Sequence, residues 1–145
     1  MLTARIICGT RDRSVESNDE LIRAIVLLGE STESPSLLIV GGCLKTARGV
    51  DAVAIRMWSE RGWPRVPMPA PWDEYRRRGM PVNRAGNDRN SMMAGVAKRL
   101  RCCGYTIYCD AFPGPKSRGT WDMYKKAESA GFKTSVYRLL LEGQS

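Results

Sequence analysis

The 145-residue sequence contains no histidine. This absence excludes the Ser-His-Asp and Cys-His pairs that activate nucleophiles, and also zinc sites that are built on imidazole. Any proton transfer must therefore be carried by a carboxylate, Lys, Tyr or Cys side chain. None of the five cysteines stands in Cys-x-x-Cys spacing. We accordingly predict that the protein holds no metal ion and requires no cofactor.

Long apolar runs are also missing. No run approaches the ~20 residues that a membrane span needs, and the first residues lack the apolar core and cleavage site of a signal peptide. Cys8 and Cys109 lie inside short apolar runs, which predicts small buried core residues and no disulfide framework. We expect a protein of the reducing cytoplasm with no membrane partner.

The charge is positive and unevenly distributed. The net charge is +8, from 23 Lys and Arg against 15 Asp and Glu. The first 50 residues are balanced, whereas residues 51–100 contain ten basic and five acidic side chains and residues 101–145 contain seven and four. This excess favours an anionic partner, which could be a nucleotide, a nucleic acid or a membrane surface. The simpler alternative is that the charge only keeps the protein soluble.

Apolar runs alternate with segments of helical periodicity, which predicts an α/β fold. Residues 1–145 are expected to form one domain, a three-layer Rossmann-like parallel sheet of about five strands flanked by helices. Residues 69–86 are rich in Pro, Gly and Arg, lack periodicity, and predict a long functional connection. The expected strands are 5–8, 37–40, 65–68, 105–109 and 134–139, and the expected helices are 18–29, 50–60, 87–100 (or from 90) and 120–131.

Three loops that follow predicted strands combine glycines with hydroxyls or cations just before a helix. In such sheets ligands bind at the carboxyl ends of the strands, and helix N-termini attract phosphate. The sequence has no Gly-x-Gly-x-x-Gly after the first strand and no P-loop, which argues against ordinary NAD binding and P-loop NTPases. The loops supply these candidate ligand-binding residues: Gly9, Thr10, Arg11, Asp12, Gly41, Gly42, Cys43, Lys45, Arg48, Gly49, Asp51, Pro113, Gly114, Lys116, Ser117, Arg118, Gly119 and Thr120.

A set of short motifs follows in order along the sequence. The motifs are Gly9-Thr10-Arg11-Asp12, Gly41-Gly42, Gly49-Val50-Asp51-Ala52-Val53-Ala54, Pro71-Trp72 with Tyr75, Arg89-Asn90-Ser91-Met92-Met93, Phe112-Pro113-Gly114 and Gly119-Thr120-Trp121-Asp122-Met123. As an ordered set they resemble the YspA-like branch of the SLOG superfamily, the group that also contains the DprA, LOG and YpsA proteins. The resemblance implies a Rossmannoid fold that binds nucleotides or nucleotide-derived ligands, and it adds Trp72, Arg89 and Asn90 to the candidate site.

The sequence departs from that family pattern in the two cationic loops. Residues 44–48 lengthen the spacing between the Gly-Gly and Gly-Ala-Asp motifs, and Pro115 replaces the second glycine of Pro-Gly-Gly. Residues 116–118 then stand where the family has a single residue before its Gly-Thr pair. Both additions bring cations, which suggests a pocket rebuilt for a bulkier or more highly charged ligand.

The LOG-type relatives cleave the N-glycosidic bond of nucleoside monophosphates with a glutamate three residues after the Gly-Thr threonine. Met123 occupies that position here, and Asp122 is rotated by about 100° on a helix from it. We therefore favour binding over turnover. The expected ligand is an ADP-ribose-like or cyclic signalling nucleotide, held by a sensor or by a sponge of the kind a phage could use against host signalling. Phosphoribohydrolase activity is the alternative, with Asp12, Asp51 or Asp110 as substitute carboxylates.

Several roles stay open at this level. Asp51 could accept a hydrogen bond from a ribose hydroxyl or only compensate the helix dipole, and Arg89 and Asn90 could bind phosphate or hold the loop. Three consecutive arginines follow Trp72 and Tyr75 in the sequence, and they are Arg76, Arg77 and Arg78. They could form a lid over the ligand, a solvent-exposed run or, as a second alternative, a surface that binds single-stranded DNA. Homo-oligomerisation is also expected, because four residues offer more apolar surface than a small core needs: Met57, Trp58, Met92 and Met93.

Overall fold

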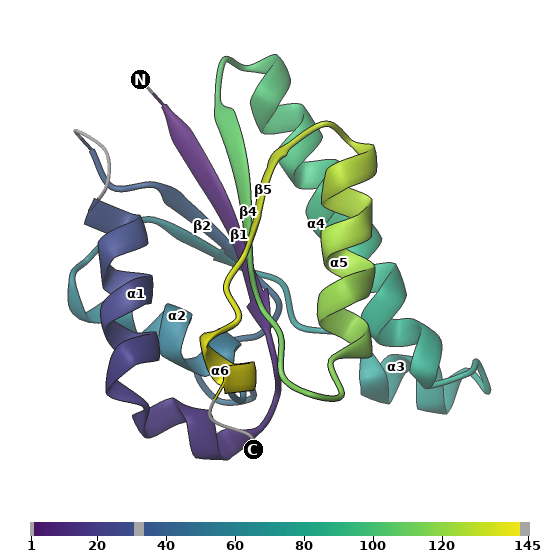
Figure 1. Cartoon of the computed structure of the whole chain (residues 1–145). Helices are drawn as coiled ribbons and strands as arrows, with labels where there is room; N and C mark the ends of the chain where they lie inside the picture. The colour runs from purple at the N-terminus through teal and green to yellow at the C-terminus, as the bar shows by residue number, and fades with distance from the viewer. Residues whose placement is uncertain (1, 31–33, 143–145) are drawn as a thin grey trace.

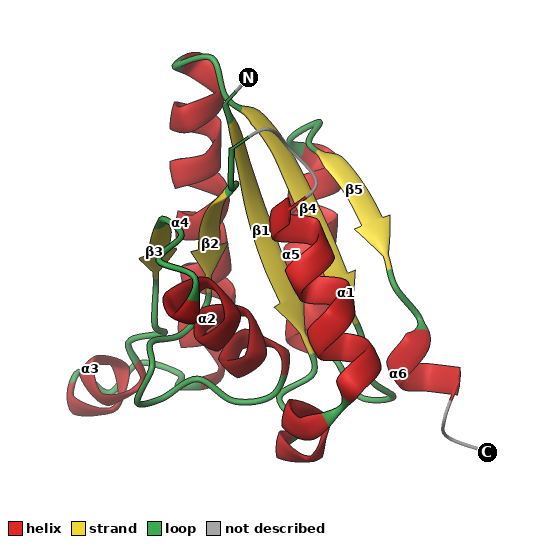
Figure 2. Cartoon of the chain, turned by 90° about the vertical axis from the view of Figure 1, so that its left-hand side faces the viewer, coloured by secondary structure: helices red, strands yellow, loops and turns green. Residues whose placement is uncertain are grey.

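A five-stranded parallel sheet with helices on both faces forms the body of the protein. The computed structural model describes residues 2–30 and 34–142, and its strand order is β3-β2-β1-β4-β5 (Figure 2). This arrangement confirms the predicted three-layer Rossmann-like α/β fold. The strands are β1 (Thr3–Gly9), β2 (Leu37–Val40), β3 (Arg65–Pro67), β4 (Thr106–Phe112) and β5 (Lys133–Val136).

The helices cover the two faces in separate layers. Helices α1 (Asp19–Glu30) and α2 (Val50–Glu60) lie on one face, and α4 (Asn83–Cys102) and α5 (Arg118–Ser129) lie on the other (Figure 1). Three short helices complete the described chain, and they are η1 (Arg13–Ser17), α3 (Trp72–Arg77) and α6 (Leu139–Glu142).

The alternation of side chains along β1 explains its unbroken apolar sequence. Ile6 and Cys8 are buried in the cluster under α4 and α5, whereas Ile7 is buried in the cluster under α1 and α2. A parallel strand that is covered on both faces has no solvent side, so its sequence does not alternate between apolar and polar residues. Cys8 and Cys109 are both buried, as predicted.

Residues 69–86 do not form one uninterrupted loop, which corrects the sequence prediction. The segment contains α3, and α4 begins at Asn83 rather than at residue 87 or 90. The first turns of α4 are mostly polar, and only Ala85 is buried before Asn90. Because a helix without an apolar stripe has no recognisable periodicity, the sequence pattern did not reveal this start.

The boundaries around β4 and β5 also differ from the prediction. β4 continues to Phe112 because it pairs with β1 along its whole length, up to the Gly9–Phe112 partners. β5 ends at Val136, and the apolar residues after it form α6 instead of more strand. α5 begins at Arg118, so Thr120 lies in its first turn and does not cap it.

Most of the apolar surface expected to drive oligomerisation is core. Trp58 is fully buried and donates from Nε1 to the Ser36 carbonyl at 2.9 Å, while Met57 and Met93 are 6% and 1% exposed. Only Met92 among these residues is exposed, at 60%. None of the helices in the described part of the chain has the length and apolar character that a bilayer span requires.

Gly49 fixes the approach of α2 to the carboxyl end of β1. Its φ is +63°, and a Cβ at this position would overlap the carbonyl oxygen of Thr10. That carbonyl accepts the amide of Val50 at 3.0 Å, so the loop after β2 is tied directly to the loop after β1. Gly62 also has a positive φ, of +66°, but nothing lies within 4 Å of its Cβ position.

We predict that Gly49→Ala lowers the free energy of unfolding by about 3 kcal/mol or more, because left-handed strain and steric overlap add together. The matched variant Gly62→Ala should lose only about 1–2 kcal/mol, from the backbone strain alone. Urea denaturation followed by circular dichroism measures both values. Equal losses in the two variants would show that the contact with Thr10 is not a constraint.

Candidate functional site

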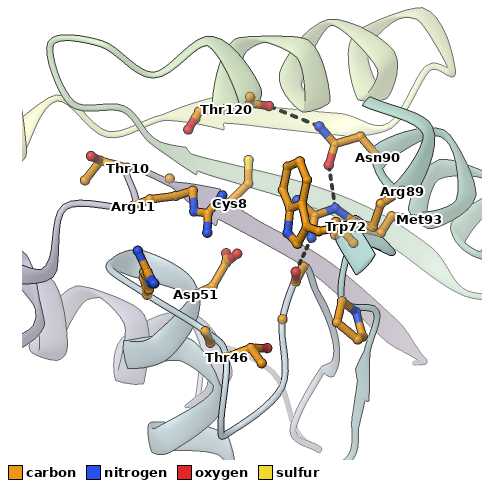
Figure 3. Close-up of a pocket in the computed structure, with 18 of the residues that line it drawn as sticks. Cys8, Thr10, Arg11, Thr46, Asp51, Trp72, Arg89, Asn90, Met93 and Thr120 are labelled. Carbon is orange, nitrogen blue, oxygen red and sulfur yellow. Dashed lines mark hydrogen bonds between the residues drawn. The ribbon is translucent and has the colours of Figure 1, made fainter. Parts of the chain in front are cut away.

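A cavity of about 590 Å³ opens at the carboxyl ends of the strands. Its floor lies where the loops after β1, β2 and β4 meet, and residues 69–74 and the first half of α4 complete its walls (Figure 3). The helices between β1 and β3 cover one face of the sheet, and those between β3 and β5 cover the other face. The strand order therefore reverses between β1 and β4. The cavity therefore occupies the switch point at which open α/β sheets bind ligands.

The structure brings most of the predicted site residues into the lining of one cavity. Those that line it are Gly9, Thr10, Arg11, Gly41, Gly42, Lys45, Arg48, Asp51, Trp72, Arg89, Asn90, Lys116, Ser117, Arg118, Gly119 and Thr120. They come from the loops after β1, β2 and β4 and from four helices, α2 to α5, and parallel pairing places the three loops at the same end of the sheet.

Two predicted residues outside the lining support the loops from behind. Asp12 is exposed and caps η1, where its carboxylate accepts the Ser14 amide at 2.9 Å. This hydrogen bond lowers the pKa of Asp12 below its usual value. Gly49 donates its amide to the Glu16 carboxylate at 3.0 Å. Both residues shape the site without facing the cavity.

The other three predicted residues outside the lining belong to the turns themselves. Cys43 contacts the Thr46 hydroxyl through its thiol, at 3.1 Å, and this hydrogen bond lowers the pKa of the thiol. Pro113 and Gly114 are buried. The Gly114 amide donates to Ser117 Oγ at 2.7 Å, which closes the turn that leads into α5.

Sequence reasoning missed a second set of lining residues: Cys8, Arg13, Thr46, Ala47, Pro69, Ala70, Pro71, Asp73, Glu74 and Met93. Most of them are immediate neighbours of predicted residues. Residues 69–74 line the cavity because the chain runs along it before α4 begins. This placement depends on contacts between segments far apart in the sequence, so no local pattern predicts it.

The cavity wall is strongly cationic. Its cations are Arg11, Arg13, Lys45, Arg48, Arg89, Lys116 and Arg118, against the carboxylates Asp51, Asp73 and Glu74. None of these seven cations takes part in an ion pair among the described residues. The guanidinium of Arg11 instead lies over the ring of Trp72, 5.6 Å from its centroid. Charges that converge without partners on a concave surface are suited to an anionic ligand.

The N-terminus of α5 is open towards this cavity. Its first turn contains no acidic residue, and Ser117 makes no capping hydrogen bond because its hydroxyl accepts the Gly114 amide instead. Thr120 is only 4% exposed, lines the cavity, and makes no side-chain hydrogen bond among the described residues. The free first amides of the helix, this hydroxyl and the cations of Lys116 and Arg118 form a set of donors suited to phosphate.

The N-terminus of α2 is partly occupied. The Gly49 amide is bound by Glu16 and the Val50 amide by the Thr10 carbonyl. Asp51 in the first turn adds a negative charge at the same place. Of the three helix N-termini expected to face a phosphate, that of α5 is open, that of α2 is partly occupied, and that of η1 after β1 is capped by the Asp12 carboxylate.

Arg89 and Asn90 hold the walls of the cavity together, which is one of the two roles that the sequence left open for them. Arg89 donates from Nη1 to the carbonyls of Gly41 and, at 3.3 Å, of Met68. Its Nε donates to Asn90 Oδ1 at 3.0 Å, and Asn90 Nδ2 donates to the Gly119 carbonyl at 3.2 Å. These bonds connect the ends of β2 and β3 with the start of α5.

Asp51 is the central carboxylate of the site. It is half-buried, close to the end of β2, and Figure 3 shows it between Arg11 and Thr46. Burial raises the pKa of the Asp51 carboxyl to about 6, although the nearby guanidinium groups of Arg89 and Arg11 act in the opposite direction. Near neutral pH it can therefore accept a hydrogen bond or exchange a proton.

The other carboxylates considered for catalysis are engaged elsewhere. Asp110 is buried in an ion pair with Arg5 at 2.9 Å and does not line the cavity. Asp122 accepts from Asn90 Nδ2 at 3.0 Å and pairs with Lys126. Met123 is 1% exposed and belongs to the buried cluster under α4 and α5.

The arginine run on α3 is largely neutralised by its own helix. Arg76 pairs with Asp73 at 2.9 Å and Arg77 pairs with Glu74, three residues earlier in each case. Tyr75 donates its hydroxyl to Asp88 of α4, which ties α3 to α4. The arginines and aromatic side chains of this segment therefore do not form one continuous surface of unpaired groups.

No protein-family model matches this chain, and a search of curated protein sequences also finds no match. Within the described residues, no group of three or more Cys, Asp or Glu side chains is placed to hold a metal ion. The fold and the site geometry therefore carry the functional argument.

We predict that Asp51→Asn stabilises the protein at pH 7.5 by on the order of 2 kcal/mol, because the ionised carboxylate is the form that burial penalises. The native Asp51 keeps its proton up to a pKa of about 6, above the value of 3.8 for a free carboxyl. The stability gap should therefore be full above pH 6 and close as the pH falls towards 4. Urea denaturation of both proteins across this range measures the gap, and a gap independent of pH would contradict the assignment.

Proposed function

We propose that this protein is a SLOG-like nucleotide-binding protein that holds a phosphorylated nucleoside derivative, such as an ADP-ribose-like or cyclic signalling nucleotide. The observation that carries the proposal is the open N-terminus of α5, which faces a cavity whose cations form no ion pairs within residues 2–30 and 34–142. The motif resemblance and the shared Rossmann-like fold support the same conclusion.

The geometry supports one orientation of the ligand. A phosphate binds to the first amides of α5, Thr120, Lys116 and Arg118. The indole of Trp72 gives the base a flat surface for stacking, which is how proteins commonly hold unstacked bases. Asp51, which lines the same cavity, accepts a hydrogen bond from a ribose hydroxyl.

Sequestration or sensing agrees with the placement of the acidic groups better than turnover does. Position 123 holds a methionine that is buried in the core, where it cannot transfer a proton. A role in the cytoplasm is part of the proposal, and the five cysteines are free thiols. A ligand sponge used by a phage against host signalling, and a homo-oligomeric state, remain predictions.

We predict that a bound nucleotide raises the melting temperature of the protein. A ligand present at 100 times its dissociation constant should add about 2.7 kcal/mol to the free energy of unfolding. In K116A/R118A the affinity should fall by about tenfold or more, because two charge-assisted contacts to phosphate are lost. Thermal shift assays with a nucleotide panel, and mass spectrometry of small molecules released on denaturation, measure both effects.

The matched control is K98A/R99A, which removes the same charge from exposed positions of α4 outside the cavity. It should bind nucleotides as the wild type does. Single-stranded DNA serves as the competing ligand in the same assay. Absence of any nucleotide shift, together with DNA binding that weakens steeply with salt, would favour the nucleic-acid alternative instead.

N-glycosidic hydrolysis is the second candidate function, and the position of Asp51 favours it. Asp51 lines the cavity, burial raises the pKa of its carboxyl to about 6, and a general acid or base works best with a pKa near the working pH. The other described carboxylates that line the cavity, Asp73 and Glu74, lie on α3 and pair with arginines.

If the protein is a hydrolase, incubation with nucleoside monophosphates releases free base, and Asp51→Asn lowers the rate by about 100-fold or more. Chromatography of the products measures the release, and Asp12→Asn is the control because Asp12 lies outside the cavity. We expect no release from the wild type. Base release that depends on Asp51 would replace the binding proposal with the enzymatic one.

A further inference from the structure

The segment that lengthens the loop after β2 forms an ordered turn. The amides of Thr46 and Ala47 both donate to the Cys43 carbonyl, at 3.1 and 2.8 Å. The turn packs tightly against Gly42, where a Cβ would lie 2.9 Å from the Cβ of Ala47. Side chains of this segment are therefore presented to the cavity from a fixed backbone.

The turn presents two cations and a hydroxyl to the cavity. Lys45, Thr46 and Arg48 all line it and are all exposed. Neither Lys45 nor Arg48 belongs to an ion pair in the described part of the chain, in contrast to the arginines of α3. Two unpaired cations on a rigid turn are a second set of donors for an anionic group.

This second set lies across the cavity from the N-terminus of α5. β2 and β4 flank β1 on opposite sides, so their carboxyl ends are about 10 Å apart, which is two strand spacings. Figure 3 shows Thr46 and Thr120 on opposite walls. A phosphate that sits on the α5 amides is thus far from the backbone of residues 43–48.

Asp51 lies between the two sets, with the guanidinium groups of Arg11 and Arg89 close to it (Figure 3). The amides of Gly49 and Val50 in the same place are already bound by Glu16 and by the Thr10 carbonyl. A single phosphate on the α5 amides does not also contact the turn, because the strand ends beneath the two sets are about 10 Å apart. The two walls therefore suit two anionic groups that are joined by an uncharged spacer.

We propose that the ligand carries two separate phosphates on opposite sides of a sugar, as in a nucleoside 3′,5′-bisphosphate or a dinucleotide, and that Lys45 and Arg48 bind the second phosphate. The inference rests on the proposed function, because it assumes that the first phosphate lies at α5. Within the proposed function it favours ligands with separated phosphates over monophosphates and over nucleotides with adjacent phosphates, among them the ADP-ribose-like ones.

The test compares three probes that share a nucleoside: the 5′-monophosphate, the 5′-diphosphate and the 3′,5′-bisphosphate of adenosine, with the guanosine series in parallel. Isothermal titration calorimetry at constant ionic strength measures each affinity. We expect the bisphosphate to bind about tenfold tighter than the monophosphate, and the diphosphate to gain less than about threefold.

The variant K45A/R48A removes the second set of donors from exposed positions. It should reduce the advantage of the bisphosphate to less than about twofold while monophosphate affinity changes little, which is the coupling that a double-mutant cycle isolates. K98A/R99A should preserve the advantage, and K116A/R118A should weaken all three probes.

Two outcomes separate the inference from the proposed function. If the monophosphate binds as tightly as the bisphosphate, or if K45A/R48A weakens every probe by the same factor, the second subsite is overturned and nucleotide binding stands. If neither these probes nor any member of the nucleotide panel used for the thermal shift assays binds, the proposed function itself is overturned, and the inference with it.

Discussion

The backbone of Gly9 and Thr10 holds the three functional loops in one place. The Thr10 amide donates to the Phe112 carbonyl at the end of β4, at 3.1 Å, and the Thr10 carbonyl accepts from Val50 at the start of α2. A Cβ at Gly9 would lie 2.6 Å from the Phe112 carbonyl oxygen and would overlap Val50. The close approach of these backbones fixes the distance between the walls of the cavity, so the charged side chains on the loops converge.

The pairing of charges separates structural cations from those that can bind a ligand. Arg5 is buried against Asp110 within the sheet, and Arg76 and Arg77 are neutralised on their own helix. The cations around the cavity have no such partners among the described residues. The unpaired positive charge is therefore concentrated around the cavity. Asp51 is the one carboxylate among the described lining residues that lies at the start of α2, between the cations of the loops after β2 and β4.

Arg89 and Asn90 belong to one of the sequence motifs and also support the walls of the cavity through hydrogen bonds. Their hydrogen bonds reach the ends of β2 and β3 and the first turn of α5, so the helix α4 that carries them serves as a brace for the cavity. Any contact of Arg89 or Asn90 with a ligand is additional to this structural role. The position of the open N-terminus of α5 depends on these hydrogen bonds, since Asn90 of α4 holds the Gly119 carbonyl.

The amino-acid sequence was enough to predict the fold class, the strand centres and most of the lining residues, because buried parallel strands are apolar on both faces and their loops must meet at one end of the sheet. It did not reveal the start of α4 at Asn83, whose first turns are polar, or that residues 69–74 line the cavity. Which helix N-terminus is free depends on tertiary contacts. That difference arises from Glu16 and Thr10, whose bonds to α2 join residues more than thirty positions apart in the chain, and no local pattern encodes a contact of that kind.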